Sequence, residues 1–259
     1  MQGPSTRFEG LFNPKLVENM STIYESDEYL EATGKTWHSE DSPWKAGQIL
    51  RIISKNDIHP KNVGEIGCGA GRILEELSKQ PYLRDVQFEG YDISPHAIEI
   101  CARIDSRNCN FSCSDLLAEE NTQKRFDILL VIDVFEHIPD YIGFVRKCRN
   151  KADYKIYHIP LEINVSSVLR NSFIPMGGVF AGGRSHIHYF TADWAIATLR
   201  ETGHEIIDYF YTCGSFGLFW QHPSIKTAIA NCPRWLFSKF SLPFTARVFG
   251  GYSLLVLAR

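Results

Sequence analysis

The sequence predicts an α/β fold, a doubly wound, Rossmann-like sheet of seven strands that is mostly parallel, with an antiparallel last strand and insertions in the C-terminal half. Apolar segments of strand length alternate with amphipathic helical segments between residues 62 and 159. A turn with glycine at alternate positions, 67–71, joins the first of these strands to the first helix. Such a turn brings bare backbone N–H groups against a nucleotide-like ligand.

The individual elements follow from the same patterns. We expect parallel strands near residues 62–67, 86–92, 108–113, 126–132 and 153–159. We expect helices near residues 46–54, 71–80, 95–105, 140–149 and 191–203. Residues 204–212 alternate like a strand, and the apolar segment 252–258 is its expected antiparallel partner.

Composition restricts the class of protein. The chain has 259 residues, 44% of them hydrophobic, which is ample for a large core, and its net charge of −3 gives no general attraction to nucleic acid. The seven cysteines contain no C-x-x-C pair, which favours free thiols in a reducing compartment over disulfides or a zinc site. No apolar run is long enough to span a membrane and no signal peptide opens the chain, so we expect a cytoplasmic protein.

The expected organisation has two parts. Residues 1–60 form an N-terminal arm and cap, and residues 61–259 form the main domain, with insertions at 161–190 and 213–251. The cap contains Trp37 and Trp44 in a polar, irregular stretch. These tryptophans either cover the cofactor cleft or cap the edge of the sheet, and the sequence leaves both alternatives open.

The glycine turn differs from the dinucleotide fingerprint G-x-G-x-x-G, because Arg72 stands at the third glycine position and the third glycine comes one residue early. Residues 65–71 instead read E-x-G-x-G-x-G. This run resembles motif I of the class I S-adenosylmethionine-dependent methyltransferases. The resemblance continues through the strand that ends in Asp92, the segment around Asp115, and the E-H-I run at 136–138, which is similar to the small-molecule or quinone-type branch.

This resemblance implies S-adenosyl-L-methionine as the cofactor. It implies that Asp92 takes the ribose hydroxyls and that Asp115 contacts the adenine amine. Asp92, Asp115 and Asp133 could each be an ordinary helix cap, but three acids at one edge of the sheet favour a cofactor site. The candidate cofactor-binding residues are Glu65, Gly67, Cys68, Gly69, Gly71, Asp92, Ile93, Asp115, Leu116, Asp133 and Val134.

Three histidines are candidate catalytic residues: His137, His186 and His188. The first follows Asp133 and Glu136 in a polar cluster, which can be a solvated helix start, hold a general base, or bind a metal. The metal alternative comes from a resemblance of this cluster to a metal-linked motif of quinone-biosynthesis O-methyltransferases. We expect no metal, since methyl transfer needs none. The other two histidines stand in a run that resembles the H-x-x-x-F/Y-T segment of glycan and small-molecule methyltransferases.

Two segments of the C-terminal half lack acidic residues, 163–192 and 215–250. The first contains Arg170 and Arg184, which could bind a phosphate or carboxylate, so we predict an anionic acceptor. The second combines cations with eight aromatic side chains. It is either a helical flap packed on the domain or a surface that contacts lipid or a lipid-linked acceptor.

The sequence therefore predicts methyl transfer to an oxygen or nitrogen of a small acceptor, anionic or linked to lipid or sugar. The alternatives are a nucleotide-dependent oxidoreductase of Rossmann type and a non-catalytic protein that binds S-adenosylmethionine. Arg72, Glu65 and Asp115 disfavour the oxidoreductase. The oligomeric state and the acceptor are left open.

Overall fold

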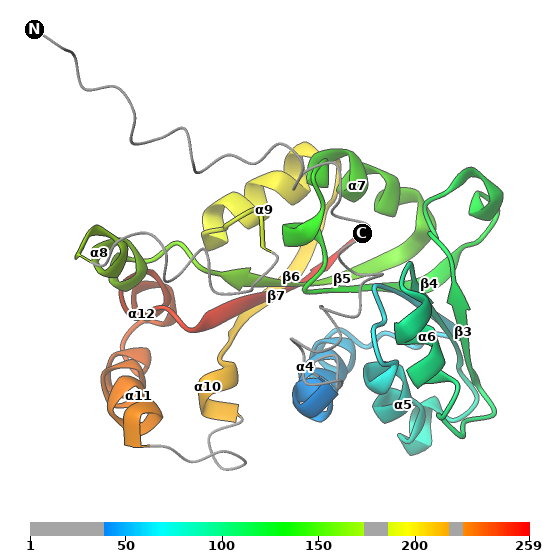
Figure 1. Ribbon diagram of the computed structural model, residues 1–259, viewed down its shortest axis with the longest axis horizontal. Helices are drawn as coiled ribbons and strands as arrows, with labels where there is room; N and C mark the ends of the chain where they lie inside the picture. The colour runs from blue at the N-terminus through cyan, green and yellow to red at the C-terminus, as the bar shows by residue number, and fades with distance from the viewer. Residues whose placement is uncertain (1–38, 174–185, 218–224) are drawn as a thin grey trace, which may run out of the picture.

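The computed structural model describes residues 39–173, 186–217 and 225–259, and these form a seven-stranded sheet with helices on both faces (Figure 1). The strand order is β3-β2-β1-β4-β5-β7-β6. The strands are β1 (Asn62–Ile66), β2 (Gln87–Asp92), β3 (Cys109–Cys113), β4 (Phe126–Ile132), β5 (Ala152–Leu161), β6 (Ile206–Thr212) and β7 (Tyr252–Ala258). Strand β7 lies antiparallel to both of its neighbours, and the other pairs are parallel. The predicted fold class is confirmed.

Helices cover the sheet in two layers, as Figure 1 shows. One face carries α4 (Ser42–Lys55), α5 (Arg72–Ser78) and α6 (Pro95–Cys101), and the opposite face carries α7 (Tyr141–Cys148) and α9 (Ala192–Glu201). Each face has its own apolar cluster, built from alternate residues of the same buried strands. Leu130, for example, packs on the α4–α5 side and its neighbour Leu129 on the α7–α9 side.

The central strands are apolar on both faces because both faces are covered. Residues 128–131 of β4 are fully buried, as expected for a parallel strand between two helix layers. From β1 the chain continues to β2, toward one edge of the sheet, and from β4 it continues to β5, toward the other edge. The order reverses between β1 and β4, where open α/β sheets leave a crevice at the carboxyl ends of the strands.

The second half contains helices that the strand pattern does not predict. The segment after β5 forms α8 (Val165–Phe173), and the connection from β6 to β7 contains α10 (Gly214–Gly217), α11 (Ile225–Ser238) and α12 (Leu242–Phe249). Helices α11 and α12 pack on each other, and α8 lies against α12, so these helices gather beyond one end of the sheet (Figure 1). Among the described residues, no helix is long and apolar enough to cross a membrane.

One buried histidine ties β5 to the loop before β6. The Tyr157 hydroxyl lies 2.8 Å from Nε2 of His204, and the Thr202 hydroxyl lies 3.2 Å from its Nδ1. Burial, reinforced by the nearby charge of Lys155, lowers the pKa of His204 to about 4. The native state therefore holds this imidazole neutral at a pH where the unfolded chain protonates it.

This neutral histidine makes stability depend on pH. Stability from this group is complete above pH 6.5 and is lost as pH falls toward 4, at up to about 1 kcal/mol per pH unit. In the variant His204→Gln, the fall in unfolding free energy across that window should be shallower than in the wild type. Urea unfolding at a series of pH values measures the difference, and parallel profiles would contradict the assignment.

Candidate active site

A pocket of about 910 Å³ lies at the carboxyl edge of the sheet, at the switch between β1 and β4. Its lining comes from the loops after β1, β2, β3 and β4 and from residues 39–45 at the start of α4. Ten of the predicted cofactor residues line it: Glu65, Gly67, Cys68, Gly69, Asp92, Ile93, Asp115, Leu116, Asp133 and Val134. His137 and His186 line it as well.

The floor of the pocket is the glycine turn. Gly67 and Gly69 have φ angles of 68° and 51°, which favour glycine over residues with a Cβ. A Cβ on Gly69 would meet no described atom within 4 Å, so this backbone faces open space in the pocket. The turn is held from β2, because the Gly69 N–H and the Ser94 N–H each donate to the Asp92 carboxylate at 2.9 Å. Asp92 thus positions the loop and still presents lone pairs to a ligand.

Glu65 precedes this turn and is buried with one carboxylate oxygen that has no hydrogen-bond partner among the described residues. Burial raises the pKa of Glu65 well above its usual value, with Cys101 adding to the effect and Lys45 opposing it. A buried orphan carboxyl on a pocket wall is costly unless a ligand completes it. The group it would suit is a cation with N–H donors.

Two of the predicted site residues lie outside the pocket. Gly71 does not line the pocket; it is buried at the start of α5, where a Cβ would meet the Phe111 ring at 2.6 Å, so its role is packing. His188 does not line the pocket either, and its Nε2 lies 3.0 Å from the carbonyl oxygen of Ile138 and 3.2 Å from that of Pro139. Nε2 of His188 donates to these carbonyls and is not available as a base, and the ring lies outside the pocket, so His188 is a weaker candidate than His137 and His186.

Asp133 lines the pocket but is committed to an ion-pair network. Its carboxylate lies 2.9 Å from Nζ of Lys45 and 2.6 Å from Nδ1 of His158, and its backbone φ is 54°. Burial works against its charge, but His158 and Lys45 outweigh burial and hold the pKa of Asp133 well below its usual value. Lys45 also reaches Asp41 at 3.1 Å, so the start of α4 is fastened to the carboxyl end of β4.

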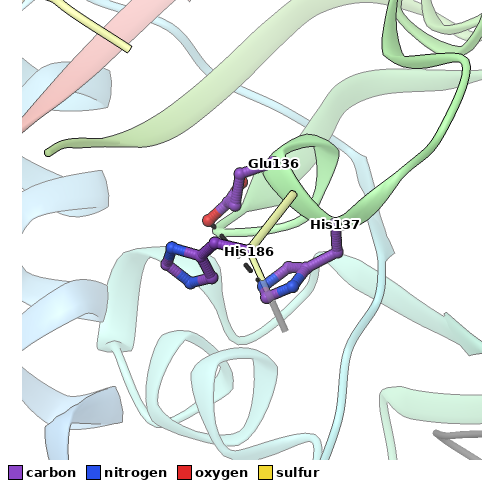
Figure 2. A group of neighbouring side chains, drawn as sticks. All are labelled: Glu136, His137 and His186. Carbon is purple, nitrogen blue, oxygen red and sulfur yellow. Dashed lines mark ion pairs between the residues drawn. The ribbon is translucent and has the colours of Figure 1, made fainter. Parts of the chain in front are cut away.

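A second polar cluster lies at the acceptor side of the pocket, where Glu136 and His137 of the short helix η4 (Phe135–His137) face His186 (Figure 2). One ligand atom from each of these three side chains lies within 4.8 Å of the others. Behind the cluster, Nδ1 of His186 lies 2.8 Å from a carboxylate oxygen of Glu162, which follows β5. Two imidazoles and a carboxylate fit a divalent metal, whereas Asp133 is occupied by its own partners.

Comparisons with known proteins agree with this geometry. Residues 65–152 match the family model of a methyltransferase domain. A ubiquinone biosynthesis O-methyltransferase of Coxiella burnetii is 30% identical over 91 residues, which are 34% of this chain and 37% of that protein. The chain thus spans little more than a third of the length of that relative.

Two solved structures share the fold over nearly their whole length. The plantazolicin methyltransferase BpumL, in complex with S-adenosylhomocysteine, superposes with a TM-score of 0.60 over 95% of this chain and 96% of its own, at 16% identity. The N-methyltransferase NodS of Bradyrhizobium japonicum, in complex with the same molecule, gives 0.55 over 94% and 97%, also at 16% identity. Residues 65–152 thus match a methyltransferase domain, and the chain shares the fold of two methyltransferases that bind S-adenosylhomocysteine. These similarities are those expected of a protein that uses S-adenosylmethionine as its cofactor.

The pocket and the side chains that hold its lining in place include residues that the sequence analysis missed. Asp41 and Lys45 stand four apart, the spacing of a helical ion pair, which was the available signal. His158 is a polar residue inside an apolar strand, and buried polar residues are the informative exceptions in such a pattern. Glu162 gave no signal, because its partner His186 is distant in sequence.

Some predictions fall on residues that the structure does not describe. Trp37 and Arg184 lie outside the described residues, and so does the Arg170 side chain. Trp44 is described, and its ring packs edge to face with the ring of His158, with centroids 6.1 Å apart.

The two lysine–aspartate pairs of α4 provide a matched test of the network. Lys45 is largely buried against Asp133, whereas Lys55 forms an exposed pair with Asp208. Lys45→Gln should lower the unfolding free energy by about 1–3 kcal/mol, because it leaves a buried carboxylate without its cation. Lys55→Gln should cost at most about 1 kcal/mol. Equal losses in denaturant titrations would show that the Lys45 pair is an ordinary surface contact.

Proposed function

We propose that the protein transfers a methyl group from S-adenosylmethionine to an oxygen or nitrogen of a small acceptor. The observation that carries the proposal is the pocket over the glycine turn, with an orphan carboxyl on one wall and two histidines on the other. The cofactor supplies a methyl group already activated on a sulfonium. The protein's part is to hold donor and acceptor in line and away from water.

The pocket has a group for each part of the cofactor. The bare backbone at Gly69 allows close approach, and Asp92 accepts from ribose hydroxyls beside it. Ile93 is 43% exposed although it lines the pocket, so it offers an apolar surface for a base next to the Asp115 carboxylate. Glu65 accepts from the ammonium of the methionine part, and that cation restores the charge that burial disfavours.

An acceptor with a hydroxyl must lose a proton, and His186 is the best-placed group to take it. Glu162 holds Nδ1 of His186, which directs Nε2 toward His137 and the pocket. A carboxylate behind an imidazole fixes its tautomer and raises its basicity. An amine acceptor that arrives neutral needs positioning more than a base. The choice between oxygen and nitrogen thus turns on whether activity requires this dyad.

The chemical character of the acceptor rests on the acid-free segments. Residues 163–192 follow β5 and include His186, which lines the pocket. The lack of acidic residues in this segment supports an anionic acceptor. On α11, on α12 and in the turn between them, the side chains of Trp235, Phe244 and Phe240 are 56%, 51% and 82% exposed. Lys239 lies over the Trp235 ring at 3.6 Å. Exposed aromatics beside a cation favour an interface, which supports a peripheral contact with lipid or a lipid-linked acceptor.

Binding of the cofactor is tested first, by calorimetric titration of the protein with S-adenosylmethionine, S-adenosylhomocysteine and NAD. Asp92→Ala should weaken binding of the first two by about 1–3 kcal/mol, because charged hydrogen bonds to ribose and the support of Gly69 are lost. Asp85→Ala, at an exposed carboxylate, is the control and should change nothing. Preferential binding of NAD would favour the oxidoreductase alternative instead.

Chemistry is tested with a panel of phenols, amines and carboxylates as methyl acceptors. His186→Ala should lower kcat toward hydroxyl acceptors about 10²–10⁴-fold, with affinity for S-adenosylhomocysteine retained, because the proton has no acceptor. His188→Ala, whose ring lies outside the pocket, is the matched control. An unchanged rate in His186→Ala would show that catalysis depends only on the positioning of donor and acceptor. If the wild type transfers a methyl group to none of the acceptors, a non-catalytic binding protein is favoured.

A further inference from the structure

The cluster of Glu136, His137 and His186 is more organised than a chance meeting of polar side chains. Glu136 is fully buried, and neither of its carboxylate oxygens has a hydrogen-bond partner among the described residues. Its side chain points at the two imidazoles, as Figure 2 shows, and Nε2 of His137 is 4.0 Å from the nearer oxygen. A buried carboxyl left without a partner points to a ligand that the protein alone does not provide.

The backbone holds the third member in place. The N–H groups of Ile187 and His188 both donate to the carbonyl oxygen of Glu136, at 3.0 and 3.1 Å. These bonds fasten the segment that carries His186 directly onto η4, although it lies 50 residues further along the chain. The His137 and His186 rings meet edge to face with centroids 4.6 Å apart. The three side chains are therefore positioned by the fold and not by their own flexibility.

A second carboxylate completes the arrangement. Oε2 of Glu162 lies 2.8 Å from Nδ1 of His186, which leaves Nε2 as the free ligand atom. Histidines that bind metals almost always donate their other ring nitrogen to such a partner. A divalent cation would give the two oxygens of Glu136 the partner that they lack among the described residues.

We propose that Glu136, His137 and His186 form a site for a divalent first-row transition ion such as Zn²⁺ or Co²⁺, with Glu162 as the residue that orients His186. Two nitrogen donors and one oxygen donor suit these ions better than Mg²⁺ or Ca²⁺, which prefer oxygen. Bonds of about 2.1 Å would draw the three ligand atoms closer together than they now stand. Three protein ligands leave a coordination position open toward the pocket.

This ligand set differs from the one that the sequence motif suggests. The motif combines Asp133 with Glu136 and His137, but the Asp133 carboxylate is already paired with Lys45 and His158. His186 takes its place from a distant segment. The site also reverses the expectation of no metal, because the orphaned carboxyl and the Glu162–His186 pair are visible only in the folded chain. An ion here would occupy Nε2 of His186, so His186 could not act as a base while the ion is bound. The ion itself would then promote loss of the proton by lowering the pKa of an acceptor hydroxyl bound to it.

Metal binding is measured on the full, tag-free chain without cofactor, by visible absorption of added Co²⁺ and by calorimetry with Zn²⁺. The wild type should show the d–d bands of protein-bound Co²⁺. His186→Ala and Glu136→Gln should abolish them, and Glu162→Gln should weaken affinity about 10–100-fold, as loss of an orienting partner does. Asp133→Asn and His188→Ala should leave affinity unchanged within a few-fold. Affinity for S-adenosylhomocysteine in each variant reports whether the fold is intact.

Three results would overturn the site. A wild type that binds S-adenosylhomocysteine but no Co²⁺ would rule out the metal site and leave the methyl-transfer proposal standing. Loss of binding in Asp133→Asn but not in His186→Ala would restore the motif's ligand set. Equal loss in His188→Ala and His186→Ala would assign the signal to surface histidines.

Discussion

The reversal of strand order between β1 and β4 is the constraint on which the rest of the structure depends. Helices after β1 and β4 leave toward opposite faces, so the carboxyl ends of these two strands cannot be covered by either layer. The glycine turn occupies one side of the resulting crevice and η4 the other. Every group that we assign to cofactor, base or metal lies on one of these two sides or on a segment that docks against them.

Three carboxyl groups lie at or beside this crevice, and their partners separate their roles. Asp133 has Lys45 and His158 and is held as an anion, which makes it a structural link to α4. One oxygen of Glu65 and both oxygens of Glu136 have no hydrogen-bond partner among the described residues, and burial raises the pKa of both groups well above the usual value. A paired carboxylate stabilises the fold, whereas an unpaired one is a place where a ligand gains binding energy.

The acceptor side is built by elements that are distant in sequence. Glu162 follows β5, His186 follows the segment after α8, and His137 follows β4. The backbone bonds from Ile187 and His188 to Glu136 bring these three together. This half of the site is the part in which methyltransferases of one fold differ, since binding residues are carried on the loops of a common scaffold. The family model matches residues 65–152, which lie in the cofactor half, in agreement with this division.

The sequence by itself determined the fold class, the strand positions and which acids lie at the carboxyl edge of the sheet. Local periodicity specifies strands and helices, and an acid at a strand end is placed once the direction of its strand is known. The sequence could therefore predict that Glu65, Asp92 and Asp115 share one pocket. Only the tertiary structure decided which histidines face the pocket, that Asp133 pairs with Lys45, and that Glu162 contacts His186. Only the tertiary structure likewise decided that Gly71 and His188 lie outside the pocket. Their partners are set by packing between segments that are far apart in the chain, and no local pattern records such contacts.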